Sequence, residues 1–138
     1  MKAALVVSAI VCFYLAIIYL IGRRKWSRMA ATLLARRPNP TQGEFVSFLA
    51  PDVEPETAEW FWNELLIYFR PTLAPHPDDD LMSDLPIDGD EPDDWVQEYC
   101  KRNGLSLRQP GKWPDRRPVT PRNLLGWLES ERRRLTTN

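Results

Sequence analysis

One histidine is followed closely by three aspartates, and these residue types can bind a metal ion. The histidine is His76, the sequence continues with Pro77-Asp78-Asp79-Asp80, and the chain has 1 histidine in all. A catalytic zinc ion normally takes three protein ligands of suitable geometry. One histidine with aspartates alone is a poor zinc site, so we expect His76 to be a loop residue and the chain to hold no metal.

The stretch around His76 resembles the His-Pro-Asp-Asp-Glu motif of zinc-dependent N-acetylglucosaminyl-phosphatidylinositol-type deacetylases. That family places the motif after a buried β-strand in a larger, sheet-containing domain and takes a further histidine from elsewhere. The context differs here, because residues 65–70 are predicted to be helical and the sequence offers no second histidine. We therefore do not expect deacetylase activity.

Other catalytic arrangements are missing from the sequence. Cys100 is expected on the core face of a helix, where cysteine behaves as a small hydrophobe. A calcium loop starting at Asp78 needs Gly at its sixth place and Glu at its twelfth, but Ser83 and Gly89 stand there. We expect neither enzyme activity nor a cofactor, and loose cation binding by the acidic residues stays open.

Charge is segregated along the chain. Residues 77–98 contain ten acidic residues and no basic one, whereas residues 101–134 contain ten basic residues and three acidic ones. Such blocks can attract each other within the fold, recruit a charged partner, or remain solvated. The acidic block would repel phosphate groups, so we do not expect nucleic-acid binding.

A long apolar segment lies near the start of the chain. Residues 3–21 form 19 positions without a charged side chain. At about 1.5 Å per residue, this helix would measure about 29 Å, close to the ~30 Å hydrocarbon core of a bilayer. A signal peptide has a shorter apolar core, and a buried helix of this kind needs a larger soluble body. We expect a transmembrane helix in contact with membrane lipid through residues 3–21.

Basic residues set the expected orientation of this helix. Lys2 precedes the apolar segment, and six basic residues follow it: Arg23, Arg24, Lys25, Arg28, Arg36 and Arg37. The cytoplasmic flank of a membrane helix carries the excess of Lys and Arg. The N-terminus should therefore face out, and residues 22–138 should be cytoplasmic. Cys12 and Cys100 are too far apart in sequence to suggest a disulfide framework, which agrees with a reducing compartment.

Proline, glycine and capping signals predict short helices after the apolar segment. Thr41 with Glu44 forms a capping box, Gly104 suits a left-handed helix end, and Thr120 with Pro121 starts a helix. Trp95 is expected to face the core. The predicted helices span about residues 41–49, 55–69, 90–103 and 120–134, with an irregular loop at 71–87. We predict an all-α chain with a single N-terminal transmembrane helix and a small helical bundle, divided into an anchor (1–24), a basic juxtamembrane linker (25–40) and a helical domain (41–138).

The segment that opens the third of these short helices resembles acyl carrier proteins. Its sequence is Asp84-Leu85-Pro86-Ile87-Asp88-Gly89-Asp90-Glu91-Pro92-Asp93-Asp94-Trp95. The closer likeness is to domain-of-unknown-function family 1493, a set of small bacterial carrier-like proteins, whose last helix opens similarly to residues 118–125. The resemblance implies an acyl-carrier-like bundle, an acidic recognition helix and a bacterial inner-membrane location. Gly89 falls where carriers have the serine that accepts phosphopantetheine, and glycine has no hydroxyl to load.

Taken together, these patterns predict a membrane-anchored cytoplasmic acyl-carrier-like interaction module of unknown pathway. It would dock a protein partner through Asp88, Asp90, Asp93 and Asp94 and carry no chemistry of its own. Two alternatives stay open. The first is a working acyl carrier that uses an unusual serine, with Ser83 and Ser106 nearest in sequence. The second is a small immunity or accessory protein at the inner membrane.

Overall fold

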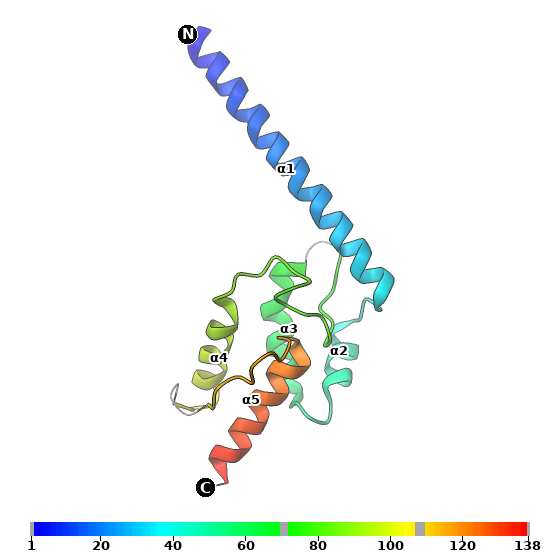
Figure 1. Ribbon diagram of the computed structural model, residues 1–138, viewed down its shortest axis with the longest axis vertical. Helices are drawn as coiled ribbons and strands as arrows, with labels where there is room; N and C mark the ends of the chain where they lie inside the picture. Colours follow the sequence, from blue (N-terminus) through cyan, green and yellow to red (C-terminus); the bar gives the residue numbers. More distant parts are fainter. Residues whose placement is uncertain (1, 70–71, 107–109, 138) are drawn as a thin grey trace. The chain divides into compact units, whose positions relative to one another are not determined.

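The computed structural model describes residues 2–69, 72–106 and 110–137. Within these ranges the chain forms five helices and no strand, which confirms the all-α prediction (Figure 1). The chain divides into two compact units, Met1–Arg37 and Pro38–Asn138. The helices are α1 (Lys2–Arg36), α2 (Gln42–Leu49), α3 (Pro55–Phe69), α4 (Glu91–Arg102) and α5 (Pro121–Thr136).

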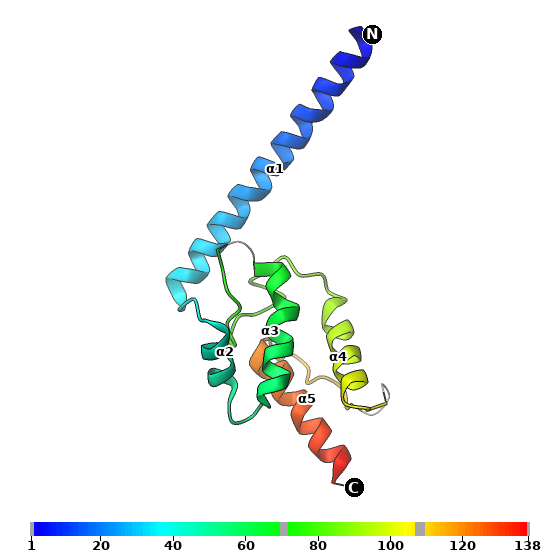
Figure 2. The same cartoon turned by 180° about the vertical axis from the view of Figure 1, so that it is seen from behind.

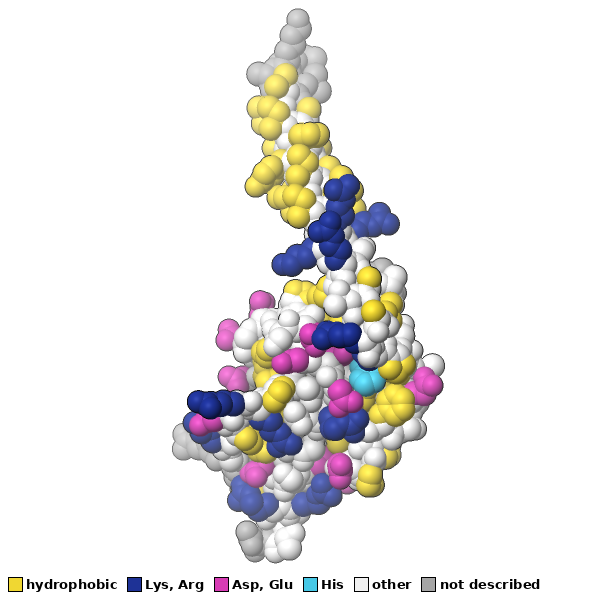
Figure 3. Space-filling view, turned by 45° about the vertical axis from the view of Figure 1, so that its right-hand side comes forward, with side chains coloured by type: hydrophobic (Ala, Val, Ile, Leu, Met, Phe, Trp, Pro, Cys, Tyr) yellow, Lys and Arg dark blue, Asp and Glu magenta, His cyan; other side chains and the backbone are white. Residues whose placement is uncertain are grey.

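The first unit is the single helix α1. It has 35 residues and so measures about 52 Å along its axis. Large apolar side chains from Val6 to Ile21 are exposed, with Phe13 at 69%. Figure 3 shows these side chains along α1, followed by a cluster of Lys and Arg. Among the described residues, α1 is the one helix long and apolar enough to cross a membrane.

The helix does not end where the apolar segment ends. It continues through the basic stretch to Arg36 and stops before Pro38, which cannot donate a backbone hydrogen bond and disfavours helix in the residue before it. The expected anchor (1–24) and most of the expected linker (25–40) are therefore parts of one helix. The domain boundaries themselves stay predictions.

The second unit starts with a capped short helix. The Thr41 hydroxyl accepts a hydrogen bond from the Glu44 N–H at 3.3 Å, and the Glu44 carboxylate accepts one from the Thr41 N–H at 2.8 Å. This confirms the predicted capping box. The hydrogen bonds from Thr41 lower the pKa of Glu44 because they favour its charged form. The helix that follows presents Phe45 and Leu49 to the core.

Helix α3 lies between α2 and α4 in both ribbon views (Figures 1 and 2). Phe61, Leu65 and Phe69 are fully buried and form an apolar stripe at four-residue spacing along α3. Trp62 is buried as well, and its ring meets that of Phe45 on α2 with the centroids 5.2 Å apart. Since α3 also contacts α5, it is the central element of the unit.

The predicted signals of Gly104 after α4 and Thr120 before α5 are both confirmed. Gly104 adopts φ +64° just after α4, and Thr120 caps α5 by accepting a hydrogen bond from the Asn123 N–H at 3.1 Å. Asp90 occupies the N-cap position of α4, but its side chain makes no capping hydrogen bond. Its backbone is in the α region there rather than the extended conformation that directs a capping side chain at the helix.

Candidate functional site

The acidic residues gather at the first turn of α4. This turn contains Glu91, Asp93 and Asp94, and Pro92 occupies a position where its missing N–H costs no helical hydrogen bond. The carboxylates lie at the positive end of the helix dipole, and Lys101 and Arg102 lie in the last turn at its negative end. The charged side chains at both ends of α4 therefore interact favourably with the helix dipole.

Aromatic rings fix α4 against α3. The Trp95 ring meets the Phe61 ring edge-on with the centroids 5.1 Å apart, and the Trp60 and Tyr99 rings are 6.3 Å apart. Trp95 is only 4% exposed, so its expected place in the core is confirmed. The Trp95 ring also lies beside the ring of Tyr68, which comes later in α3 than Phe61, with the centroids 6.2 Å apart. Later residues of α3 thus pair with earlier residues of α4, and the two helices run antiparallel.

The four aspartates predicted to bind a partner are all exposed. Asp88 and Asp90 lie in the turn before α4, while Asp93 and Asp94 lie in its first turn. None of the four carboxylates forms an ion pair or a side-chain hydrogen bond with another part of the chain that the structure describes. The structure brings them to one end of α4, but Asp93 and Asp94 line different hollows on its two sides.

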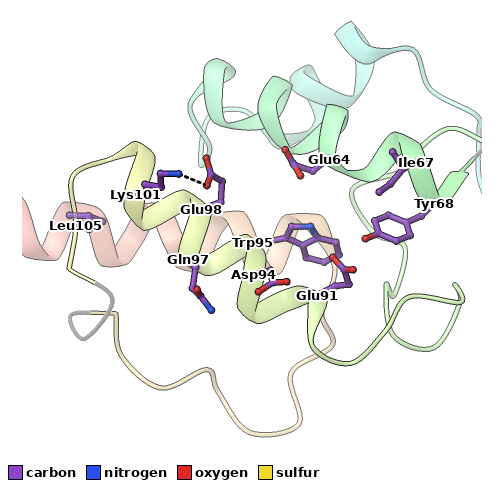
Figure 4. A pocket seen from close by; sticks show the side chains of 10 residues that line it. All are labelled: Glu64, Ile67, Tyr68, Glu91, Asp94, Trp95, Gln97, Glu98, Lys101 and Leu105. Atoms are coloured by element: carbon purple, nitrogen blue, oxygen red, sulfur yellow. Dashed lines mark ion pairs between the residues drawn. The ribbon is translucent and has the colours of Figure 1, made fainter.

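The hollow on the Asp94 side is a groove between α3 and α4 with a volume of about 850 Å³ (Figure 4). Four carboxylates and one lysine line it, together with apolar and aromatic groups. Ile67 on α3 is 67% exposed at its edge, unlike the buried stripe of the same helix. The lining residues are Glu64, Ile67, Tyr68, Glu91, Asp94, Trp95, Gln97, Glu98, Lys101 and Leu105.

Charges inside this groove act on Tyr68. Partial burial first, and then a hydrogen bond to Glu91, raise the pKa of Tyr68 to about 12. The negative charges of Asp88 and Glu64 add to the effect, because an anionic phenolate is disfavoured near carboxylates. The only lysine that lines the groove, Lys101, lies 3.7 Å from Glu98. The groove is therefore a negative surface at neutral pH.

The hollow on the Asp93 side is smaller and more apolar. Its volume is about 420 Å³, and α4 contributes Asp93 and Val96 to its wall. Trp113 and Trp127 form the opposite wall, with ring centroids 5.4 Å apart at 85°. Gly89 also lines this hollow. A Cβ atom built at Gly89 would meet no atom within 4 Å, so a small side chain such as serine has room to start at this position.

The predicted loop residue His76 belongs to a set of local hydrogen bonds. Its Nδ1 accepts from the Asp78 N–H at 3.2 Å, and its own N–H donates to buried Asp79 at 3.0 Å. Helix α3 reaches Phe69 before this loop, while Arg70 lies outside the described residues. No group of three or more His, Cys, Asp and Glu side chains suited to a metal occurs within the described ranges. The aspartates here organise turns.

A buried carboxylate on α5 was not predicted. Glu129 is 1% exposed and accepts hydrogen bonds from Thr57 at 2.9 Å and from Arg132 at 2.7 and 3.2 Å. Arg132 also pairs with Glu54, so the cluster connects α5 with the start of α3. Burial first, and then the charge of Glu129, raise the pKa of Tyr99 above its usual range.

Comparisons with known proteins give no relative from which a function can be transferred. No family model matches the chain, and neither the curated proteins nor the solved structures give a significant match. The resemblance to acyl carrier proteins therefore stays a prediction that rests on the residues quoted above. The site itself must carry any functional argument.

Proposed function

We propose that this chain is a membrane-anchored, non-catalytic interaction module that docks a protein partner through the acidic end of α4. The proposal rests on the exposure of four carboxylates and on their lack of partners within the described part of the chain. The four residues are Asp88, Asp90, Asp93 and Asp94. All four carboxylates are exposed, and none is paired within the described part of the chain. A surface of this kind is complementary to a basic patch on another molecule.

The energetics of α4 support this interpretation. Five acidic residues between Asp88 and Asp94 repel one another, and like charges four apart, such as Asp90 and Asp94, destabilise a helix by a few tenths of a kcal/mol, about 0.2–0.5. The helix dipole offsets part of this repulsion. A cationic partner would remove the remaining repulsion among these carboxylates. Complementary charge also speeds the association of two proteins.

The location in this proposal comes from α1 and from the basic residues that follow its apolar part. The excess of Lys and Arg after residue 21 supports a single pass with the N-terminus out and unit Pro38–Asn138 in the cytoplasm. The carrier-like sequence around Gly89 supports a bacterial inner membrane and an acyl-carrier-like bundle. Gly89 has no hydroxyl, so the proposed module works without a phosphopantetheine arm.

Charge reversal on the full chain tests this function. We expect Asp90→Lys, Asp93→Lys and Asp94→Lys together to abolish recovery of the partner from detergent extracts. The matched control is Glu56→Lys with Glu59→Lys, since both acids are exposed and lie on α3 outside the groove. Equal partner recovery by the α4 variant and the wild type, with unchanged circular dichroism, would remove the acidic helix from the function.

A further inference from the structure

The groove between α3 and α4 has an orientation set by its charges. Glu91, Asp94 and Glu64 lie along one part of it, whereas Lys101 lies toward the end of α4 (Figure 4). Glu98 is 3.7 Å from Lys101 and offsets its charge. A ligand in this groove would therefore meet carboxylates near the start of α4 and a lysine near its end.

An apolar contact is available in the same groove, on the side away from Lys101 (Figure 4). Ile67 is 67% exposed on α3, where the neighbouring stripe residues Leu65 and Phe69 are fully buried. The Trp95 indole and the Tyr68 ring also line the groove. An exposed aliphatic side chain beside aromatic rings favours a ligand that brings one apolar side chain as well as positive charge.

The helices that form the groove restrict the form of the ligand. Backbone groups inside α3 and α4 are hydrogen-bonded within each helix, so the groove offers no strand edge to an extended peptide. Recognition must then rely on side chains, as in the binding of an amphipathic helix to a hydrophobic groove. The stretch from Glu91 to Lys101, eleven residues, spans about 15 Å, which accommodates nearly three turns of a partner helix.

We propose that this groove seats a cationic amphipathic helix of the protein partner. Its Lys or Arg side chains meet Glu64, Glu91 and Asp94, and one apolar side chain packs on Ile67. Lys101 lies toward the end of α4, where it offsets the charge of Glu98 and weakens the attraction for a cationic side chain. This inference rests on the proposed docking function and adds Glu64 and Ile67 of α3 to the contact surface.

The test measures peptide binding to the full chain in zwitterionic lipid nanodiscs. The probe is a fluorescent synthetic peptide with lysines on one helical face and leucines on the other, and empty nanodiscs give the background. We expect Ile67→Ser to weaken binding about five- to tenfold, as for an interface anchor. Glu64→Gln and Asp94→Asn should each weaken it about two- to fivefold at low salt. Lys101→Gln should strengthen binding.

A matched control variant distinguishes binding in the groove from non-specific attraction of the cationic peptide to acidic residues elsewhere on the surface. Glu59→Gln, on α3 outside the groove, should bind the peptide like the wild type. If Ile67→Ser and Glu64→Gln bind as tightly as the wild type, the groove inference is wrong. The docking function would still stand if the α4 charge-reversal variant had lost its natural partner, and it would fail together with the groove if partner recovery were unchanged.

Discussion

The guanidinium of Arg122 donates two hydrogen bonds to the carboxylate of Asp78, at 2.7 and 3.2 Å. A third goes to the backbone oxygen of Phe48 at 2.6 Å. One side chain of α5 thereby joins the loop after α3 to α2. The hydrogen bonds from Arg122 also lower the pKa of Asp78. This ion pair gives Asp78, the first of the three aspartates that follow His76, a structural role.

Removal of this guanidinium should destabilise unit Pro38–Asn138 at neutral pH. We expect Arg122→Gln to cost about 1–2 kcal/mol, because charge-assisted hydrogen bonds are lost but the carboxylate is partly solvated. Urea unfolding in detergent, followed by tryptophan fluorescence, measures the change. Lys112→Gln is the control, since Lys112 forms an exposed pair with Asp115 at 3.1 Å and should change stability very little.

The effect of Arg122→Gln should depend on pH. The pKa of Asp78 is lower in the folded protein than its ordinary value, which is about 3.9 in an unfolded chain. The unfolded state then binds the proton first, so the stabilisation is present above about pH 4 and is lost as the pH falls through the folded pKa. A difference between wild type and variant that stays constant into strong acid would contradict this account.

Arg132 should be the most sensitive charged residue of the domain. Arg132→Met leaves buried Glu129 without its cationic partner, and breaking a buried ion pair in this way costs about 3–5 kcal/mol. Arg134→Met is the control, because Arg134 pairs with Glu131 near the surface. The double variant Glu129→Met with Arg132→Met should recover much of the loss, and its failure to do so would show that the cluster acts through packing.

Membrane anchoring predicts how α1 responds to a charge. Leu15→Lys places a lysine near the centre of the apolar segment, at a cost of about 3 kcal/mol for insertion. We expect this variant to shift from the carbonate-resistant membrane fraction toward the supernatant. Leu15→Ile should remain in the membrane. Wild-type protein recovered mainly in the supernatant would contradict the anchor.

The missing hydroxyl at Gly89 predicts that the chain accepts no phosphopantetheine. Co-expression with a phosphopantetheinyl transferase, followed by intact-mass measurement, should leave the mass of the full chain unchanged. Gly89→Ser is the informative companion variant, since the position has open space. An added arm on the wild type would favour the alternative of a carrier that uses another serine.

The helices could be predicted from sequence because their signals are local. The Thr41–Glu44 box, Thr120 before Pro121, and Gly104 each act within a few residues of a helix end. Asp90 lies at the N-cap position of α4 without a capping hydrogen bond because its backbone is in the α region, which sequence alone does not indicate. Helix α1 continues through the basic stretch and ends at Arg36, just before Pro38, where a proline is expected to stop a helix.

The candidate site could be predicted only in part. The aspartates of α4 stand out in the sequence, but the groove depends on the antiparallel packing of α3 against α4. Ile67 could have been noticed as an apolar residue outside the stripe of α3. Glu129 also had a signal, because it follows Pro121, Leu124, Leu125 and Leu128 at the next position of the apolar face. A carboxylate at such a position indicates a buried partner.

The Glu129–Arg132 cluster has a consequence for the order of events during synthesis. Its partners Thr57 and Glu54 are made long before it, and Arg132 follows Ile21 by roughly 110 residues. At about 5–20 residues per second, α5 leaves the ribosome about 5–20 s after the apolar segment. Thr57 and Glu54 must therefore remain without their partners until Glu129 and Arg132 have been made. The contacts of this cluster can thus form only after the whole of α1 has been made.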